Sequence, residues 1–349
     1  MLPPSMKLCQ FLCQKTFLKP SSLPNLRRFQ SACIRKARLI QSLKDNNKVN
    51  DELLQQARFA VFRNFKPLVA ENSSGGYHIP WKGFCELSAI LREQQPVLLT
   101  NDISATTDPT CSPESFSFAI NIPSDGEQGT EKSIGDVTEF ATEMRRAMFI
   151  ISQEDTDILS QGYGLLKWHS MNSFCPNCGT KTVSDAVGSK RMCEECNQVN
   201  YPKMAPIVIT LVMDGDRCLV VRQPTFPQGM FSALAGFCEI GETIEMSTRR
   251  EVAEEVGLLV DNVHYQQSQH WPFPTSGLMI GCYATIIPGT AHQMSLDEKE
   301  LEDARWMSRE EVKSVLESNT RSKAGRSSIW FPPPGAIAHH LIKHWAFTK

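Results

Sequence analysis

Hydrophobic runs in the second half of the chain predict a sheet. Residues 205–213 (APIVITLVM) and 217–222 (RCLVVR) are apolar at most positions, which is typical of strands. The turn 214–216 (DGD) between them contains Asp-Gly, a strong signal for a hairpin. Two more strands are expected at 263–269 and 278–287. Together these segments predict a mixed sheet.

Helical patterns alternate with the strands. One helix is predicted from Thr243 to Val256, where Gly257 follows as the residue best able to adopt the left-handed cap conformation. Two further helices are expected at 308–316 and 336–345. We expect these helices to pack on the sheet.

Patterns in the first half are weaker and predict a separate α+β domain over residues 45–170. Short apolar runs at 96–100 and 116–123 suggest strands. Residues 136–151 and 155–169 repeat apolar side chains at helical spacing instead. We find no internal repeat in the chain.

Length and composition limit the classes of protein that remain. At 349 residues the chain exceeds what one hydrophobic core usually organises, so two or three units are expected. The formal charge of -2 gives no general attraction to nucleic acid or to an anionic membrane. No run approaches the roughly 18 apolar residues of a spanning helix, so no membrane partner is expected.

Residues 1–44 differ from the rest in charge. They contain nine Lys or Arg residues and no Asp or Glu, with Ser, Leu and Phe interspersed. This composition is typical of a mitochondrial transit peptide, and Lys or Pro interrupts every stretch that could serve as a secretory signal. A disordered basic tail is the alternative. We predict import into the mitochondrial matrix.

Four of the twelve cysteines form a metal-binding pattern within residues 171–203. Two Cys-x2-Cys pairs are separated by fourteen residues, and Gly179 allows the first pair to turn tightly. Four thiolates suit tetrahedral Zn²⁺ and leave no position for water, so we predict a structural zinc ribbon. Its ligands are expected to be Cys175, Cys178, Cys193 and Cys196.

Other interpretations of the cysteines are weaker. The remaining eight are scattered, which does not fit a disulfide framework and favours a reducing compartment. A ribbon that binds nucleic acid needs a strong basic footprint, and the loop between the pairs has only Lys181, Lys190 and Arg191. We therefore expect a structural clip between the two domains.

Three glutamates in the predicted helix suggest a second metal site. Glu251, Glu254 and Glu255 share one helical face because they are spaced i, i+3 and i+4. Such a run is usually a solvated acidic face. Here Val252 and Val256 form part of an apolar stripe beside it, so the carboxylates are expected at a packed edge. Clustered oxygens favour Mg²⁺ or Mn²⁺ and hydrolysis of a diphosphate.

Residues 236–258 resemble the Nudix box, G-x5-E-x7-R-E-U-x-E-E-x-G-U with U aliphatic, at every defined position. The resemblance implies a Nudix α/β/α sandwich with a mixed sheet over 204–349, after the ribbon and the N-terminal α+β domain. It also implies Mg²⁺ or Mn²⁺, with Glu251 and Glu255 as principal ligands. The other implied roles are assistance or water orientation by Glu254, bracing by Arg250 and Glu242, and a metal contact from the Ala235 carbonyl.

A second stretch, 268–276 (SQHWPFPTS), concerns the substrate. Prolines fix the backbone around Trp271 and Phe273, which suits stacking on a flat heterocycle. A packed turn is the equally weighted alternative. The stretch resembles the S-Q-P-W-P-F-P-x-S signature of NADH pyrophosphatases, a Nudix subfamily, with His270 in place of a proline.

The ribbon and the segments 201–206 (YPKMAP) and 332–338 (PPPGAIA) resemble the same subfamily. This resemblance implies a further metal ligand, Glu300. It also implies these substrate contacts: Tyr201, Gln269, His270, Trp271, Pro272, Phe273, Pro274, Thr275, Ser276 and Ala338.

The subfamily resemblance implies hydrolysis of NADH or NADPH to reduced nicotinamide mononucleotide and AMP or 2'-phospho-AMP, by a homodimer. The leader makes mitochondrial members the nearest match. A rival substrate is the NAD cap of RNA, which presents the same diphosphate. Residues 204–349 contain 13 Lys or Arg against 17 Asp or Glu, so they offer no obvious track for a phosphate backbone. A catalytically silent adaptor, whose ribbon binds a partner, is the rival of another class.

Overall fold

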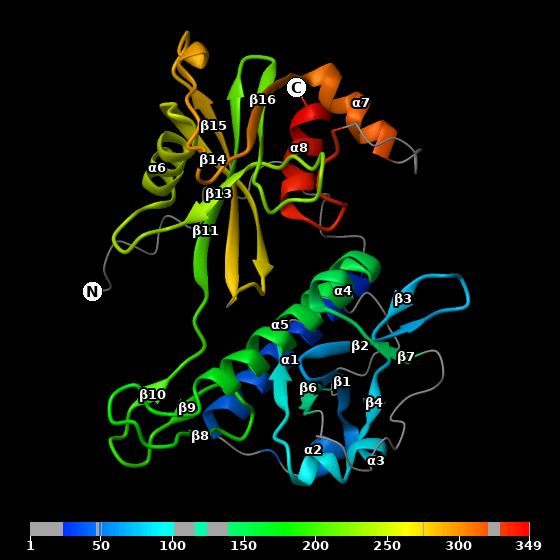
Figure 1. The fold of residues 1–349 in the computed structure, drawn as a ribbon. Coiled ribbons are helices and arrows are strands. Elements are labelled where there is room, and N and C mark those ends of the chain that lie inside the picture. Colours follow the sequence, from blue (N-terminus) through cyan, green and yellow to red (C-terminus); the bar gives the residue numbers. More distant parts are fainter. Residues whose placement is uncertain are drawn as a thin grey trace.

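Three structured parts follow one another in the computed structural model (Figure 1). The structure describes residues 24–46, 49, 51–100, 116–123, 139–274, 276–319 and 329–348. An N-terminal domain leads through a long helix into a small ribbon, and the ribbon leads into a C-terminal domain. None of the helices in the described ranges is long and apolar enough to cross a bilayer.

The C-terminal domain is built on a six-stranded mixed sheet of order β14–β15–β11–β12–β16, with β13 beside β11. Strand β11 runs parallel to β15 and antiparallel to β12. The predicted hairpin is confirmed, and Gly215 adopts φ +58° in its turn. The strands are β11 (Ala205–Asp214), β12 (Arg217–Arg222), β13 (Leu234–Phe237), β14 (Val260–Trp271), β15 (Gly277–Ile286) and β16 (Asp303–Ser308).

Helices cover both faces of this sheet. Helix α6 (Ile244–Val256) packs on one face, and α7 (Arg309–Asn319) and α8 (Ile337–Phe347) pack on the other (Figure 1). Successive side chains of β11 enter the two cores, since Leu211 faces α8 and Val212 faces α6. The predicted α/β/α sandwich is therefore confirmed.

The N-terminal domain also has three layers, around a sheet of order β3–β2–β1–β6–β5 with β4 beside β1 and β7 beside β2. Helices α4 (Met144–Ile150) and α5 (Gln153–Met171) pack on one face, while α1 (Pro24–Asn46), α2 (Asp51–Gln56) and α3 (Phe84–Leu87) pack on the other. The strands are β1 (Arg58–Arg63), β2 (Lys66–Glu71), β3 (Tyr77–His78), β4 (Lys82–Gly83), β5 (Val97–Leu99), β6 (Ser117–Ile122) and β7 (Glu139–Ala141). A short 3-10 helix occupies Ile90–Arg92 in this domain, and another occupies Ala291–Gln293 in the C-terminal domain.

One predicted helix of this domain is wrong over its first half. Apolar spacing in 136–151 predicts a single helix, but Glu139–Ala141 form strand β7 and pair with β2. Helix α4 begins only at Met144. Pairing with a strand that lies about 70 residues earlier decides the structure here, because sheet contacts override local pattern.

Helix α1 crosses the boundary predicted at residue 44. Ile40 is 4% exposed and packs in one core with Phe59 and Leu98. This part of α1 therefore belongs to the fold of the N-terminal domain. Residues 1–23 lie outside the described residues, so the transit peptide stays a prediction.

The ribbon is a three-stranded sheet of order β10–β9–β8. Val187 from its central loop is 1% exposed, and its carbonyl accepts a hydrogen bond from the Leu98 amide at 2.9 Å. The His169 Nε2 atom of α5 lies 2.9 Å from the Gly188 carbonyl. The ribbon thus contacts the N-terminal domain and continues directly into β11, as a clip requires. Its strands are β8 (Val183–Ser184), β9 (Arg191–Met192) and β10 (Val199–Asn200).

Candidate functional site

The four cysteines predicted to bind zinc lie together. Their Sγ atoms are all within 4.8 Å of one another, and no other group of three or more His, Cys, Asp or Glu side chains in the described ranges is as close. Cys175 Sγ lies 3.6 Å from Cys196 Sγ, and Cys178 Sγ lies 3.4 Å from Cys193 Sγ. A tetrahedron with 2.3 Å metal–sulfur bonds has edges of about 3.8 Å, so the quartet fits Zn²⁺.

Two backbone turns present these thiols. Gly179 closes the first turn with φ +76°, and Asn197 closes the second with φ +58°. Asparagine is one of the few non-glycine residues that adopt this left-handed conformation readily. Hydrogen bonds from Thr180 lower the pKa of the Cys178 thiol to about 6. A metal-binding thiolate is therefore accessible at neutral pH.

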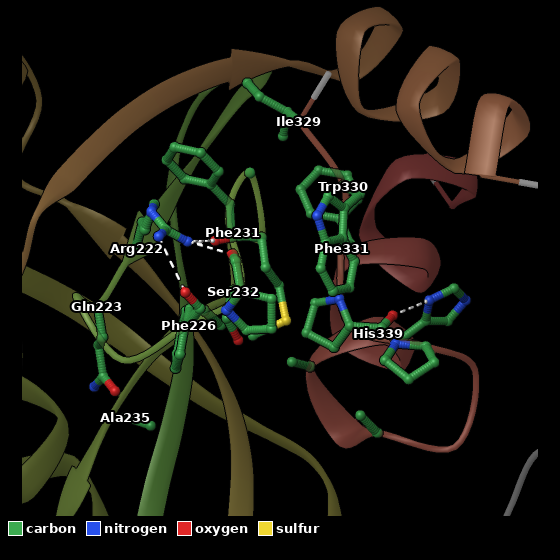
Figure 2. A pocket seen from close by; sticks show the side chains of 18 of the residues that line it. Arg222, Gln223, Phe226, Phe231, Ser232, Ala235, Ile329, Trp330, Phe331 and His339 are labelled. Atoms are coloured by element: carbon green, nitrogen blue, oxygen red, sulfur yellow. Dashed lines mark hydrogen bonds between the residues drawn. The ribbon is translucent and has the colours of Figure 1, made fainter. Parts of the chain in front are cut away.

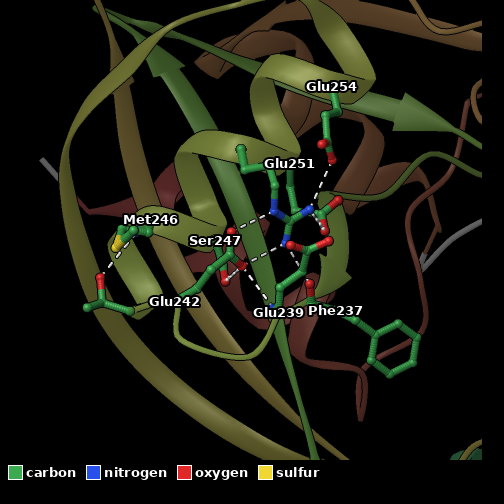
Figure 3. A network of polar contacts seen from close by, with 9 residues as sticks. Phe237, Glu239, Glu242, Met246, Ser247, Glu251 and Glu254 are labelled. Carbon is green, nitrogen blue, oxygen red and sulfur yellow. Dashed lines mark hydrogen bonds and ion pairs between the residues drawn. The ribbon is translucent and has the colours of Figure 1, made fainter.

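Helix α6 carries the predicted catalytic glutamates, and Arg250 organises them (Figure 3). Its Nε donates to Glu242 at 2.7 Å, and its Nη1 donates to Glu251 at 2.8 Å and to Glu254 at 2.9 Å. Its Nη2 donates to the Phe237 carbonyl at 2.8 Å. Arg250 therefore holds the loop before α6 against the helix, as the predicted bracing role requires.

Glu242 anchors the other side of this network. Its carboxylate accepts hydrogen bonds from Arg250, from the Ser247 hydroxyl at 2.5 Å and from the Glu239 amide at 2.9 Å. These hydrogen bonds lower the pKa of Glu242 to about 2, and the bond from Arg250 contributes most. Glu242 is thus a permanent anion that fixes the loop.

Two of the three glutamates are buried, which a solvated face does not explain. Glu251 is 9% exposed and Glu255 is 2% exposed, whereas Glu254 is exposed. The Glu255 Oε2 atom has no hydrogen-bond partner. Burial, followed by repulsion from Glu251, Glu300 and Glu254, raises the pKa of Glu255 to about 8. A buried acceptor in a negative field fits a divalent cation.

Glu300 approaches this face from outside the box. The Asp297 amide donates to the Glu255 carbonyl at 3.0 Å, and the Glu300 amide donates to the Asp297 carbonyl at 3.1 Å. Glu300 is close enough to raise the pKa of both Glu251 and Glu255. The carboxylates nevertheless do not converge as tightly as the four thiols.

The β13 strand connects this face to a cavity. A Cβ atom at Gly236 would lie 1.9 Å from the carboxyl carbon of Glu251, so a larger residue there would displace that carboxyl group. The preceding residue, Ala235, lines the cavity (Figure 2). The cavity therefore reaches Ala235, a predicted metal contact, and the next residue, Gly236, touches the carboxyl group of Glu251.

This cavity has a volume of about 1780 Å³, larger than the roughly 300–1,000 Å³ of most small-molecule sites. Its walls come from segments 222–235, 269–279 and 329–339, which Figure 2 shows in part. Arg145 and Phe149 of α4 close it from the N-terminal domain. It has room for a dinucleotide.

Three predicted substrate contacts have different positions relative to this cavity. Gln269 lines it, but its Nε2 donates to the Gly335 carbonyl at 2.7 Å and its Oε1 accepts from the Ile337 amide at 2.9 Å. Ala338 is buried and also lines it. Tyr201 is 58% exposed and is not part of the lining. Gln269 thus fixes the entry to α8.

The aromatic segment divides in the same way. Trp271 lines the cavity, whereas Phe273 does not and packs on Tyr163 of α5 at 5.7 Å between ring centres. The two rings meet edge to face at 5.6 Å. Pro272 is buried and Pro274 is exposed, while Thr275 lies outside the described residues. The packed-turn interpretation therefore fits Phe273, and Trp271 is free to contact a ligand.

His270, which replaces the expected proline, bridges the two domains. Its Nδ1 lies 3.0 Å from the Ser160 hydroxyl of α5, and its Nε2 lies 2.8 Å from the Ser276 hydroxyl. Burial lowers the pKa of His270. A neutral imidazole that donates through one nitrogen and accepts through the other satisfies both contacts.

Comparison with known proteins agrees with this site. Residues 203–331 match the NUDIX domain and residues 171–201 match the NADH pyrophosphatase zinc ribbon domain. The fold, the box network and these matches define the chain as a member of the Nudix hydrolases.

Relatives resemble the chain over most of its length. It is 38% identical over 331 residues to the mitochondrial NAD(P)H pyrophosphatase NUDT13 of Homo sapiens, covering 91% of this chain and 92% of that protein. It is 37% identical to the protein of that name from Mus musculus, over 96% and 97% of the two chains. The NAD-capped RNA hydrolase NUDT12 of Homo sapiens is 44% identical over 57% of this chain and 43% of its own length.

Proposed function

We propose that this chain hydrolyses the diphosphate of NADH and NADPH. Water adds at one phosphorus and the bridging P–O bond breaks. The two products are reduced nicotinamide mononucleotide and AMP, or 2'-phospho-AMP when the substrate is NADPH. The junction of Ala235 and Gly236 carries the proposal, because the cavity reaches the first residue and the Glu251 carboxyl group touches the second. A dinucleotide in the cavity can therefore reach the carboxylates with its diphosphate.

Mg²⁺ or Mn²⁺ is the cation that we assign to this face. Glu251 and Glu255 are the principal ligands, and Glu254, Glu300 and the Ala235 carbonyl are the others. A bound ion would polarise a phosphoryl oxygen and neutralise charge on the departing phosphate. Glu254, which is exposed, assists these ligands or orients the attacking water in this proposal.

The aromatic segment holds the base or the nicotinamide in this proposal. Trp271 contacts the ring directly, and Ala338 adds apolar surface to the same cavity. Five neighbours keep the segment in position: His270, Pro272, Phe273, Pro274 and Ser276. Relatives named NAD(P)H pyrophosphatases support this substrate class.

A product assay tests the proposed function. Purified protein is incubated with NADH, NADPH, NAD⁺ or NAD-capped RNA, each with Mg²⁺, with Mn²⁺ or with chelator, and nucleotide products are separated. We expect metal-dependent AMP from NADH and 2'-phospho-AMP from NADPH. Absence of both products with either metal would overturn the proposal and revive the adaptor interpretation.

The NAD cap of RNA is a second candidate substrate. Similarity to proteins named NAD-capped RNA hydrolases favours it, and the acidic balance of residues 204–349 opposes a long RNA track. The same assay separates the two, because a cap hydrolase releases a 5'-monophosphate RNA. Faster turnover of capped RNA than of NADH would make the cap the main substrate.

We also propose that residues 1–33, which precede the buried part of α1, direct the protein to the mitochondrial matrix. The two NUDT13 relatives are named as mitochondrial, and the leader is basic and free of acids. Deletion of residues 1–33 retains the buried Ile40 and should leave a folded, active protein outside mitochondria. Unchanged import of this deletion would contradict the proposal.

A homodimer is the proposed assembly. Large apolar side chains are exposed on the ribbon and its flanks, including Phe174, Tyr201 and Met204. Light scattering during gel filtration measures the mass directly, and a monomer at micromolar concentration would contradict this assembly.

A further inference from the structure

One positive charge on the cavity wall has no carboxylate partner among the described residues. Three arginines line the cavity, and two of them are neutralised by its two lining carboxylates. Arg222 pairs with Glu302 at 3.2 Å and also donates to backbone carbonyls of its own loop (Figure 2). Arg305 pairs with Asp303 at 2.6 Å. The third arginine, Arg145, leaves the wall with a net positive charge.

Arg145 reaches the cavity from the N-terminal domain. It projects from α4, and its guanidinium carbon lies 4.9 Å from the ring centre of Phe273 and 5.6 Å from that of Trp271. These ring contacts are its only side-chain interactions within the described parts of the chain. Its charge thus meets the segment that holds the substrate in the proposed function.

Stacking on rings leaves the binding capacity of a guanidinium intact. Ring contacts use the flat face of the group, whereas its five N–H donors point outward in its plane. The planar fork matches two oxygens of a phosphate group. Trp271 and Phe273 are inclined at 76° to each other, so Arg145 can lie flat on one of them and still donate two hydrogen bonds into the cavity.

We propose that Arg145 binds a phosphate that the substrate carries in addition to its diphosphate. This inference rests on the proposed dinucleotide hydrolysis, in which the diphosphate itself lies at the carboxylate face of α6. A phosphate attached to a ribose has this chemistry, and it occurs as the 2'-phosphate of NADPH and as the phosphodiester that follows an NAD cap on RNA. The N-terminal domain then helps to select the substrate, although it carries none of the box residues.

The test compares substrates that carry or lack this phosphate; NADPH differs from NADH by the 2'-phosphate alone, whereas NAD-capped RNA also carries oxidised nicotinamide and is compared with NAD⁺. We measure kcat and KM of the full-length protein for NADH, NADPH, NAD⁺ and NAD-capped RNA, in wild type, Arg145→Gln and Arg145→Lys. Arg146→Gln is the matched control, since Arg146 follows on the same helix, is exposed and does not line the cavity. For Arg145→Gln we expect kcat/KM to fall about tenfold more for NADPH than for NADH, mainly through KM, as expected for loss of a charge-assisted hydrogen bond. Arg145→Lys keeps the charge but not the fork, so its loss should be intermediate.

Each outcome decides the inference. A selective loss for NADPH identifies the 2'-phosphate, and a selective loss for capped RNA identifies the phosphodiester. Equal losses for all four substrates, or no loss, would mean that Arg145 only supports the aromatic segment, and would overturn it. Wild type without activity on any of them would overturn the proposed function instead.

A measurement on wild type alone guards against misfolded variants. AMP and adenosine 2',5'-bisphosphate differ only by the 2'-phosphate, so their inhibition constants for NADH hydrolysis report its contribution. We expect the bisphosphate to inhibit about tenfold more strongly at equal ionic strength. Equal inhibition by the two nucleotides would contradict the 2'-phosphate assignment.

Discussion

The cysteine quartet and the carboxylate face of α6 are both candidate metal sites, but they are built in opposite ways. The four thiols already lie within 4.8 Å of one another, held by two tight turns and short strands. The carboxylates are spread over a helix and a loop, and Arg250 occupies two of them. The first site is closed by its own ligands, whereas the second reaches a large cavity through Ala235.

The difference separates two uses of a metal ion. A closed thiolate shell contributes to folding, because the complete set of ligands exists only in the folded chain and metal binding therefore stabilises that state. An open carboxylate site keeps coordination positions for water and for substrate phosphate, and tolerates a weakly held ion. Substitutions at the two metal sites test this contrast, and two in the aromatic segment follow, in order of decreasing expected effect.

Glu255→Gln should abolish most activity while the fold persists. The buried Oε2 atom lacks a partner, so the change removes a cation ligand without breaking a hydrogen bond. Turnover of NADH should fall by about two to three orders of magnitude, a loss comparable to removal of one electrostatic group from a preorganised site. Stabilisation by added Mg²⁺ should shrink as well, since binding to the native state alone raises stability. Turnover and melting temperature, each with and without Mg²⁺, measure both.

Glu245→Gln is the matched control for that variant, because Glu245 is exposed in the first turn of α6. It should leave turnover and the Mg²⁺ effect unchanged. Near-normal turnover by Glu255→Gln would remove the catalytic assignment of this face.

Cys193→Ser should have the reverse profile, a large loss of stability. The change opens the thiolate shell, so zinc content should fall and the free energy of unfolding should drop by about 3 kcal/mol. Elemental analysis and thermal unfolding measure the two quantities. Cys85→Ser, at an exposed cysteine outside the quartet, should change neither. Loss of zinc with an unchanged melting temperature would show that the quartet does not stabilise the fold.

Trp271→Ala should weaken catalysis by roughly 1–3 kcal/mol in transition-state stabilisation, as for bases stacked on aromatic side chains. Trp271 lines the cavity, so the loss should be larger for NADH than for a diphosphate without the ring that it stacks on. Phe273→Ala is the matched comparison, because Phe273 packs on Tyr163 outside the cavity. Phe273→Ala should lower catalytic efficiency equally for the two substrates. If Trp271→Ala lowered catalytic efficiency equally for both substrates, Trp271 would also have a structural role only.

His270→Ala should have the smallest effect, a loss of about 1 kcal/mol at pH 7.5 from its hydrogen bonds to Ser160 and Ser276. Burial lowers the pKa of His270 in the folded protein, so the unfolded chain takes up its proton first as pH falls. The stabilising contribution of neutral His270 is therefore complete above about pH 6.5 and declines below it. Unfolding free energies at pH 7.5 and 5.5 should differ less in His270→Ala than in wild type. An identical pH dependence of the two proteins would contradict this.

The sequence predicts the C-terminal domain better than the first half of the chain, for a physical reason. Thr243 caps α6 and Gly257 ends it with φ +66°, so both limits of that helix depend on local chemistry. In contrast, β1 pairs in parallel with β6, about 59 residues later, and no local pattern in the sequence predicts β1. A local sequence pattern does not predict strand pairing over such distances.

The site divides along the same line. The cysteines and the box glutamates are close in sequence, so their spacing reveals them. Arg145 and Ser160 lie more than 100 residues before the segment that they contact, and neither belongs to a motif. The hydrogen bonds of the Gln269 amide to Gly335 and Ile337 are likewise absent from any sequence pattern, and its contact with substrate stays a prediction. Only the fold brings these neighbours together.

The link from Gln269 to Gly335 and Ile337 has a consequence for the order in which a ribosome completes the enzyme. The ribbon, the box and the aromatic strand all leave the exit tunnel before the wall formed by residues 329–339. Until then the Gln269 amide lacks both partners, and the sheet face that α8 covers is open. A nascent chain at that stage carries every glutamate of the box but no closed cavity, so translation has to pass this wall before the chain can bind a dinucleotide.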